Sequence, residues 1–374
     1  MAPAAGPAWL RLALTPGMGA ARARALLDVF GEPGAIFQAA GNDNPNTASG
    51  QHRARLAALC GPALAAALMD APTDSLALAL ERSVRWLAGG RQRSLVCMTD
   101  ADYPAGLLQL ADAPLLLFAH GRRELLGRPG LAIVGSRNAS RQGSRNAAAF
   151  AAHLGRTGLA ILSGMAAGID AAAHQGALDA GADTVAVLGT GIDVVYPPAH
   201  VGLCARISGE GLLLSEFAPG EGPLPFHFPR RNRIIAALSR GVLVVEAATH
   251  SGSLITARLA ADLGREVFAI PGSIHSPLSR GCHQLLRDGA KLVETAQDVL
   301  EELRWPSVPP APGRSAPKQA GSGLLNALGH DPADIDTLAA RLGEDAGSVA
   351  AQLLELELAQ RVERLPGNRY QRLS

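Results

Sequence analysis

The sequence has few of the features that mark disulfide-bonded, metal-binding or membrane proteins. Its four cysteines (Cys60, Cys97, Cys204 and Cys282) are scattered and form no CxxC pair, which supports neither a disulfide framework nor a zinc site. No apolar run is long enough to span a membrane, and residues 1–8 lack the basic and apolar segments of a signal peptide. We therefore expect a cytoplasmic protein with reduced thiols, no bound metal and no membrane association.

Charge and aromatic residues are also scarce. The formal net charge is only +1, and aromatic residues make up 4% of the chain. A net charge near zero does not exclude a polyanionic partner, because local patches of charge can still bind one. The 374 residues, with 48% hydrophobic residues and 42 glycines, are typical of a globular α/β protein with two or three domains.

Common enzyme motifs are missing as well. The chain contains no GxxxxGK[ST], GxSxG or HExxH motif and no paired-carboxylate arrangement. Gly189 and Gly191 supply two glycines of a dinucleotide fingerprint, but Val194 stands where the third belongs. Asp170 and His174 lie four residues apart and could act as a base and its orienting partner, or as a capping carboxylate and a buried histidine. We predict no enzyme activity, no catalytic residue and no cofactor.

The chain divides into three regions and a linker. Residues 1–88 show helical spacing throughout, and residues 92–304 alternate apolar strands with amphipathic helices. Such alternation predicts an α/β fold with a Rossmann-like, doubly wound parallel sheet. The stretch 305–322 has the composition of a linker, and 323–374 has the pattern of a winged helix. The expected buried parallel strands are 131–135, 159–164, 184–189, 212–217, 241–247 and 266–272.

The two flanking regions each leave two interpretations open. The turn Thr15-Pro16-Gly17-Met18-Gly19 resembles a helix-hairpin-helix, whose amides can hold a DNA phosphate, but it also fits a plain packing corner. Residues 321–374 carry five arginines against eight acidic residues, a net charge of −3. This negative net charge is at least as consistent with a partner-binding or packing role as with the binding of DNA phosphates.

Glycine-rich loops follow the predicted strands and indicate a site for phosphate. Ligands of a doubly wound sheet bind at the carboxyl ends of its strands, where small residues let the backbone approach closely. The loops 135–138, 164–168 and 248–256 lie there, and two of them run directly into helices. Ser251 or Ser253 is placed to cap a helix whose free amides would attract an anion.

The segment "FPRRNRIIAALSRGVLVVEA" (228–247) carries the most unusual charge pattern. We expect a helix that begins near Arg230, and positive charge at a helix N-terminus is unfavourable unless an anion compensates it. Bidentate contacts between guanidinium groups and phosphate would supply that compensation. The alternative is that Glu216 and Glu246 pair with the arginines for structural reasons, and we expect one arginine to be structural and the others to face the ligand.

Two aromatic residues beside these arginines suggest contacts with nucleobases. Phe226 and Phe228 adjoin the basic segment, and aromatic faces next to a basic groove are typical of proteins that bind single strands. Packing of one of the two in the core is the alternative.

Six segments, in this order, resemble the motifs of the DNA-processing protein A family (DprA/Smf). They are "AIVGSRNASRQG" (132–143), "LSGMAAGIDAAAHQGAL" (162–178), "VAVLGTGIDVVYP" (185–197), "GLLLSEF" (211–217), "FPRRNRIIAALSRGVLVVEA" (228–247) and "SGSLITARLAADLGREVFAIPG" (251–272). Gln142 and His200 depart from the family pattern, which usually has tyrosine and asparagine there.

The resemblance implies a cytoplasmic, non-catalytic protein that binds single-stranded DNA and forms a homodimer. It further implies that the protein protects incoming DNA and loads a RecA-type recombinase during natural transformation. A nucleoside-monophosphate phosphoribohydrolase is the alternative, but "EAATHSGSLIT" (246–256) lacks the Gly-Gly and acidic residue of those enzymes. The residues predicted to bind DNA are Gly135, Ser136, Arg137, Gly164, Gly168, Arg230, Arg231, Asn232, Arg233, Ser251, Gly252, Ser253 and Thr256, with base stacking at Phe226 and Phe228.

Overall fold

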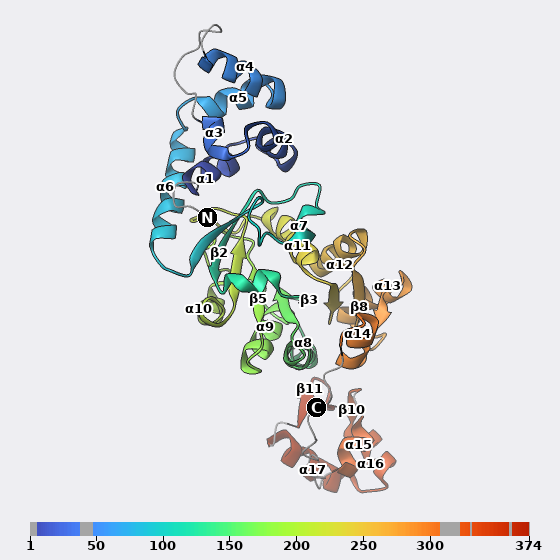
Figure 1. Cartoon of the computed structure of the whole chain (residues 1–374). Coiled ribbons are helices and arrows are strands. Elements are labelled where there is room, and N and C mark those ends of the chain that lie inside the picture. The colour runs from blue at the N-terminus through green and yellow to red at the C-terminus, as the bar shows by residue number, and fades with distance from the viewer. Residues whose placement is uncertain (1–5, 38–47, 307–321, 330, 359–360, 374) are drawn as a thin grey trace. The chain divides into compact units, whose positions relative to one another are not determined.

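A computed structural model describes residues 6–37, 48–306, 322–329, 331–358 and 361–373 (Figure 1). The chain separates into two compact units, Met1–Pro306 and Ser307–Ser374. Most of the predicted linker 305–322 lies outside the described residues.

The first part of the larger unit is helical, as the sequence predicts. Its helices bury a common apolar core that includes Leu10, Leu26 and Leu68. Thr73 caps the longest of them by accepting a hydrogen bond from the Leu76 amide. The helices are α1 (Gly6–Leu14), α2 (Ala20–Phe30), α3 (Pro33–Phe37), α4 (Ala48–Cys60), α5 (Pro62–Met69) and α6 (Asp74–Ala88).

None of the described helices is by itself suited to a bilayer. Among the described residues no single helix has the length and apolarity to cross a membrane. Helices α5 and α6 meet both requirements only as a pair, which is bent by 54°.

A nine-stranded sheet forms the centre of the larger unit in the described residues, in the order β1-β2-β6-β5-β4-β3-β7-β8-β9. The strands from β6 to β9 are parallel, while β1 and β2 pair antiparallel at one edge. The strands are β1 (Arg93–Cys97), β2 (Leu116–Gly121), β3 (Gly130–Val134), β4 (Ala160–Ser163), β5 (Thr184–Val187), β6 (Leu212–Ser215), β7 (Gly241–Val244), β8 (Glu266–Ala269) and β9 (Lys291–Leu292).

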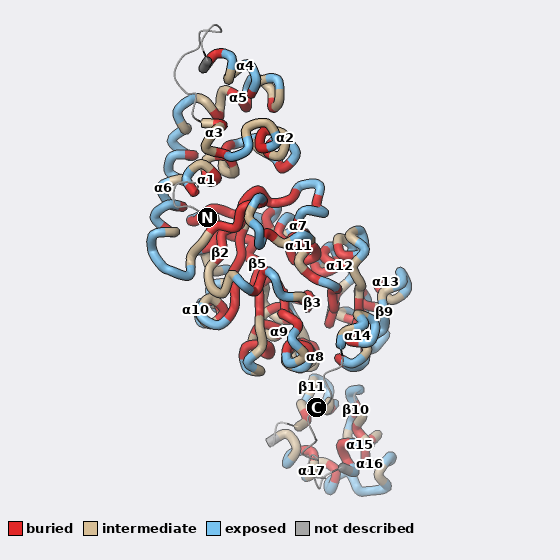
Figure 2. The backbone as a smooth tube through the Cα atoms, in the orientation of Figure 1, coloured by how far each residue is buried: buried red, intermediate tan, exposed pale blue. Residues whose placement is uncertain are grey.

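Every residue of β3 to β7 is buried, which explains why these strands are continuous apolar runs in the sequence (Figure 2). All six predicted parallel strands are present, although β8 is buried only in its second half. Along β3 the side chains alternate between two core clusters, with Ala132 and Val134 in one and Leu131 and Ile133 in the other. The sheet is thus covered on both faces, as the predicted Rossmann-like fold requires.

Helices connect the strands and cover the sheet. Helices α8, α9 and α14 contribute apolar residues to one core cluster, and α11 and α12 contribute to the other. The helices are α7 (Ala105–Leu108), α8 (Arg141–Arg156), α9 (Ile169–Asp179), α10 (Val201–Glu210), α11 (His227–Leu238), α12 (Gly252–Asp262), α13 (Arg280–Arg287) and α14 (Ala296–Glu302), with short 3₁₀ turns at Arg123–Gly127, Pro198–His200 and Pro277–Ser279.

The chain reverses its direction across the sheet at β3. From β3 it proceeds to β4, β5 and β6 on one side, and it then returns to the other side with β7 and β8. The loops that follow β3 and β7 therefore lead to opposite sides of the sheet, and a crevice lies between them. Ligands of doubly wound sheets bind at such a switch point.

The smaller unit is a winged helix, as predicted. Asp334 caps its second helix by accepting from the Thr337 amide, and Gly343 ends that helix with a φ of +68°. The elements are α15 (Ser322–Leu328), β10 (Ala333–Asp334), α16 (Ile335–Leu342), α17 (Ala346–Leu358), β11 (Val362–Leu365) and β12 (Arg369–Arg372), with strand order β10-β12-β11.

Candidate functional site

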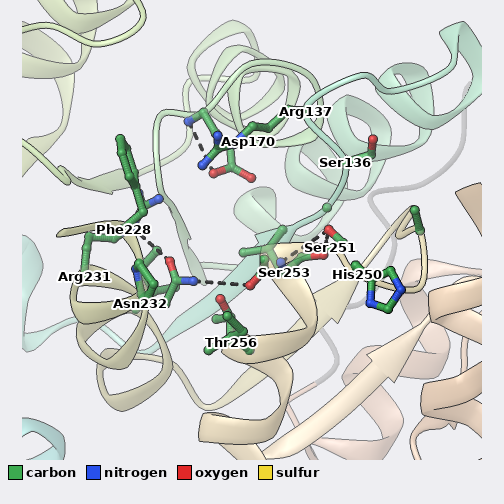
Figure 3. A pocket seen from close by; sticks show the side chains of 18 of the residues that line it. Ser136, Arg137, Asp170, Phe228, Arg231, Asn232, His250, Ser251, Ser253 and Thr256 are labelled. Carbon is green, nitrogen blue, oxygen red and sulfur yellow. Dashed lines mark hydrogen bonds between the residues drawn. The ribbon is translucent and has the colours of Figure 1, made fainter. Parts of the chain in front are cut away.

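An open cavity of about 750 Å³ occupies the switch point between β3 and β7 (Figure 3). Its walls are the loop after β3, the loop after β7, the first turn of α12 and one face of α11. The predicted site residues that line it are Gly135, Ser136, Arg137, Phe228, Arg231, Asn232, Ser251, Gly252, Ser253 and Thr256.

The loop after β3 is held rigidly by backbone contacts. The Ser136 amide donates to the Glu246 carbonyl at 2.7 Å, and the Ser136 carbonyl accepts from the Ile169 amide at 3.2 Å. Gly168 packs against this loop with a φ of +77°, and a side chain there would collide with the Ser136 carbonyl. Gly168 therefore supports the loop from behind rather than lining the cavity.

Arg137 extends from this loop into the open cavity. Its guanidinium carbon lies 5.2 Å from the centroid of the Phe228 ring, within cation–π distance. Among the described residues no carboxylate forms an ion pair with Arg137. The cavity therefore contains an exposed guanidinium group with unused hydrogen-bond donors.

The first turn of α12 forms the facing wall. Ser251 is its N-cap, with Oγ 3.4 Å from the Ser253 amide and 2.7 Å from the Ser253 hydroxyl. Amides in the first turn of a helix have no acceptor within the helix, and the dipole makes this end positive. This wall consequently favours an anion in the cavity. The predicted capping role of Ser251 is confirmed.

Arg231 lies beneath the cavity and ties three elements together. It is buried, and its Nη1 donates to the carbonyls of Gly164, at the end of β4, and Val187, in β5, the latter at 2.7 Å. Its Nε donates to Asn232 at 3.1 Å, and Asn232 donates to the Gly252 carbonyl at 3.3 Å. Burial lowers the pKa of Arg231 to about 10, so the group stays charged at neutral pH.

Asp170 is the buried counter-charge to Arg231. Burial raises its pKa, while the positive charge of Arg231 and the amides of Gly164 and Ala166, which donate to its Oδ2, act in the opposite direction. The capping interpretation of Asp170 is wrong, because the N-cap of α9 is Gly168 without a side-chain cap, and the carboxylate of Asp170 instead accepts from amides of the preceding loop. Gly164 has no room for a side chain, because one would occupy the position of the Arg231 guanidinium.

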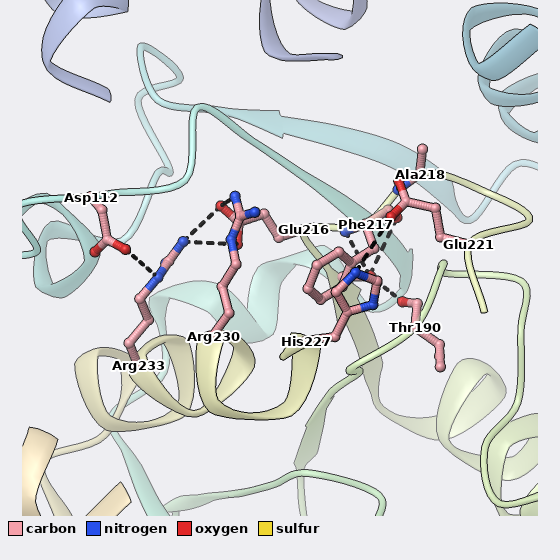
Figure 4. A network of polar contacts seen from close by, with 10 residues as sticks. Asp112, Thr190, Glu216, Phe217, Ala218, Glu221, His227, Arg230 and Arg233 are labelled. Atoms are coloured by element: carbon pink, nitrogen blue, oxygen red, sulfur yellow. Dashed lines mark hydrogen bonds and ion pairs between the residues drawn. The ribbon is translucent and has the colours of Figure 1, made fainter. Parts of the chain in front are cut away.

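Arg230 and Arg233 require a correction, because they line a different cavity from Arg137. Both point toward Glu216 (Figure 4). Helix α11 begins at His227 rather than near Arg230, so both arginines lie within the helix. Both oxygens of Glu216 accept from Nη2 of Arg233, at 2.7 and 2.8 Å, and Arg230 pairs with the same carboxylate at 2.9 Å. Asp112 completes the cluster with an ion pair of 2.9 Å to Arg233.

The two glutamates predicted as partners of the arginines behave differently. Glu216 pairs with Arg230 and Arg233, as the structural alternative proposes. The same prediction is wrong for Glu246, whose carboxylate accepts from the amide and the hydroxyl of Ser140 at 2.9 and 2.5 Å. Glu246 thereby stabilises the start of α8, where a carboxylate is favoured by the helix dipole.

Of the two residues predicted to stack on bases, only one lies in the cavity. Phe228 is half-buried and lines the cavity beside Arg137. Phe226 is 63% exposed, packs edge-on against His227 and lines none of the cavities that contain Arg137. The cavity is also lined by Asn138 and His250, from the predicted loops 135–138 and 248–256, and by Tyr196, from the motif 185–197. None of the three is among the predicted DNA-binding residues.

His174 is a structural residue. It is fully buried, and its Nδ1 lies 2.7 Å from the Thr184 hydroxyl. Burial lowers its pKa to about 3, and the positive charge of Arg231 acts in the same direction. The interpretation as a buried, hydrogen-bonded histidine is confirmed. No cluster of metal-ligating side chains is found in the part of the chain that the structure describes.

Acidification is expected to destabilise the protein through His174. Its pKa in the folded state lies below the unfolded value of about 6.5, so the unfolded chain binds the additional proton and stability falls as the pH drops below 6.5. Between pH 7 and pH 5 this group should lower the free energy of unfolding by about 2 kcal/mol. Urea titrations of the wild type and His174→Gln at both pH values measure the difference. An equal loss in both proteins would contradict the assignment.

Comparisons with known proteins agree with this architecture. The model of the family DNA recombination-mediator protein A matches residues 94–304, and that of the DprA winged helix domain matches residues 306–368. The chain is 53% identical to DNA processing protein DprA of Streptococcus pneumoniae over 206 residues, covering 55% of this chain and 73% of that protein. It is 42% identical to Protein Smf of Escherichia coli over 300 residues, covering 77% and 79%.

The solved structures similar to this chain include two of DNA processing protein A. The structure of DNA processing protein A from Streptococcus pneumoniae has a TM-score of 0.64 and 40% identity, covering 79% of this chain and 95% of that one. The structure of DNA processing protein A from Helicobacter pylori has a TM-score of 0.52 and 30% identity, covering 57% and 96%, and is described as giving insight into that protein's single-stranded DNA binding mode.

Proposed function

Because this chain belongs to the family of DNA recombination-mediator protein A, we propose that it binds single-stranded DNA in the cavity between β3 and β7. The observation that supports this most strongly is the position of Arg137. This exposed arginine has no carboxylate partner among the described residues, and it lines the same cavity as the N-terminus of α12. A guanidinium group and a helix N-terminus around one cavity are suited to a phosphodiester.

The neighbouring residues support a strand rather than an isolated anion. The cavity is open and about 750 Å³ in volume, which exceeds the space that one phosphate needs. Phe228 presents an aromatic ring beside Arg137, and bases of a single strand stack on such rings. Ser136, Asn232 and Thr256 supply polar groups from three different walls of the cavity. We assign the phosphates to Arg137 and the Ser251-Gly252-Ser253 turn, and a base to Phe228.

We further propose that the protein acts without catalysis, in the cytoplasm, as a homodimer. In this role it protects incoming single-stranded DNA and loads a RecA-type recombinase during natural transformation. This part of the proposal rests on the family and on the six sequence motifs. A pull-down of a purified RecA-type recombinase, with and without oligo-dT, tests the partner. Sedimentation of the protein alone tests the dimer.

Salt dependence tests the DNA-binding proposal directly. Fluorescence anisotropy with labelled oligo-dT should give an affinity that falls as salt rises, with a slope of about 0.7 per phosphate contacted. A duplex of the same length serves as the control and should bind more weakly, because its bases are not free to stack. Binding that does not change with salt would contradict the proposal.

Arg233→Ala is expected to leave that salt slope unchanged. The Arg233 side chain is only 7% exposed and is paired with Glu216 and Asp112, so it has no free charge for a phosphate. Its removal leaves the buried Glu216 with only the half-exposed Arg230, which should lower the thermal midpoint of unfolding. Anisotropy and a thermal melt of the same sample separate the two effects. If Arg233→Ala flattened the salt slope and left the thermal midpoint unchanged, Arg233 would be a DNA-binding residue after all.

A further inference from the structure

A second, smaller cavity of about 100 Å³ adjoins the first. Four residues line both cavities, namely Arg137, Ala166, Tyr196 and Phe228. The remaining walls of the smaller cavity are small or apolar, and they consist of Gly164, Ala167, Leu188, Gly189, Thr190 and Pro197. A ligand in the large cavity can therefore extend a group past Arg137 into the small one.

Tyr196 stands at the rim shared by the two cavities. Its side chain is 43% exposed, and its ring lies 5.7 Å from the Phe228 ring, tilted by 48°. Among the described residues no hydrogen bond to its hydroxyl is found. A tyrosine of the core usually has a buried ring and a hydroxyl group that forms a hydrogen bond. Tyr196 has neither among the described residues.

The backbone around the small cavity is shaped to place the aromatic rings. A side chain at Gly189 would come within 2.8 Å of the Phe228 ring, so the absence of one lets this ring sit against the backbone. The Thr190 hydroxyl donates to the Val194 carbonyl at 2.6 Å and adds little polarity to the walls. The cavity thus combines apolar walls, two aromatic rings and one guanidinium group at its mouth.

This chemistry differs from that of a phosphate site. Apolar walls disfavour an anion, because a charge loses its hydration there without gaining donors. A flat aromatic heterocycle fits better, since it stacks on tyrosine and phenylalanine rings and its polar edge can face Arg137. In a nucleotide such a base is joined directly to the backbone that the larger cavity would hold.

We propose that the smaller cavity takes one nucleobase of the bound strand, stacked on Tyr196, while the adjoining phosphate contacts Arg137 in the larger cavity. This inference rests on the proposed function and deepens it. Tyr196 becomes a base-contacting residue, and Arg137 connects the base subsite with the phosphate subsite. The base is held in a cavity rather than on an open surface.

Tyr196→Ala tests the base subsite by anisotropy with two oligonucleotides. With oligo-dT the variant should bind about tenfold more weakly or worse, since removing the ring on which a base stacks costs about 1–3 kcal/mol. With an abasic oligonucleotide of the same length, which retains the phosphates, the variant and the wild type should bind equally. Tyr196→Phe keeps the ring and should keep the affinity. Val201→Ala, at an exposed apolar position on α10 outside both cavities, is the matched control.

The outcomes separate this inference from the proposed function. Equal binding of oligo-dT by the wild type and Tyr196→Ala overturns the base subsite while the DNA-binding proposal stands. Failure of the wild type to bind any oligonucleotide overturns both. Photocrosslinking of wild-type protein to an oligonucleotide with 5-iododeoxyuridine gives a second readout that does not depend on how a variant folds. A crosslink in the peptide that contains Tyr196 supports the proposal, and crosslinks found only elsewhere contradict it.

Discussion

Arg137→Ala should weaken the binding of oligo-dT by about 10- to 100-fold, because a charge-assisted hydrogen bond to phosphate contributes about 1.5–3 kcal/mol. Arg137 is exposed and without an ion-pair partner among the described residues, so its removal leaves no buried charge and should not alter the fold. The salt slope should also flatten by about 0.7 for each phosphate that the variant no longer neutralises. Anisotropy at four or more salt concentrations measures both quantities.

Two control variants make this test specific. Arg137→Lys retains the charge but not the planar donor fork, so it should keep the salt slope and lose part of the affinity. Arg156→Ala removes an exposed arginine at the opposite end of α8 from the cavity, and it should bind like the wild type. If Arg137→Ala and Arg156→Ala have the same small effect, the cavity is not the phosphate site.

Arg231→Leu should lower the free energy of unfolding of the larger unit by about 3–5 kcal/mol, as is usual when one partner of a buried charged pair is removed. The substitution leaves Asp170 buried without its counter-charge and leaves the carbonyls of Gly164 and Val187 without their donor. Denaturant titration followed by tryptophan fluorescence measures the loss. Arg230→Ala, which removes a half-exposed arginine from the same helix, should cost far less.

A double-mutant cycle shows whether Arg231 acts through Asp170. Asp170→Asn removes the negative charge, so the combined variant should lose less stability than the sum of the two single variants. Additive losses would indicate that the carbonyl contacts alone account for the effect. A loss below about 1 kcal/mol in Arg231→Leu would contradict the view that this buried arginine holds the loops together.

The central strands can be predicted from the sequence because burial on both faces requires apolar residues at every position. Strands β3 to β7 are buried on both faces, and each is a short, continuous apolar run. Strands β1 and β2 pair antiparallel at the edge of the sheet and are not among the predicted strands, although Leu116–Ala119 in β2 is also a buried apolar run. Strand β9 has only two residues, both exposed, and gives no such signal. The winged helix is recognisable from its turns, although the two-residue β10 is not.

The orientation of the arginines could not be predicted from spacing. Arg230 and Arg233 share a helical face, but only the tertiary packing of α11 decides that this face meets Glu216. Pro229 favours a later start, yet proline is tolerated in the first turn of a helix, and α11 begins at His227. Asp112, the other partner of Arg233, is distant in the sequence, and only the tertiary fold brings the two together.

Tyr196 belongs to the motif 185–197, but its place beside Phe228 could not be predicted, for a related reason. It lies several residues beyond β5, in a connection without helical or strand periodicity. Its place beside Phe228 follows from the packing of that connection against α11. The glycine-rich loops, in contrast, were predictable, because the carboxyl ends of parallel strands meet at one edge of the sheet.

The most direct measurement is a crystal structure of the full chain with a short dT oligonucleotide. We expect a phosphate within hydrogen-bond distance of both Arg137 and the Gly252 amide, with Arg230 and Arg233 still paired to Glu216. A strand bound on another surface, with the cavity between β3 and β7 free of nucleotide, would contradict the proposed site.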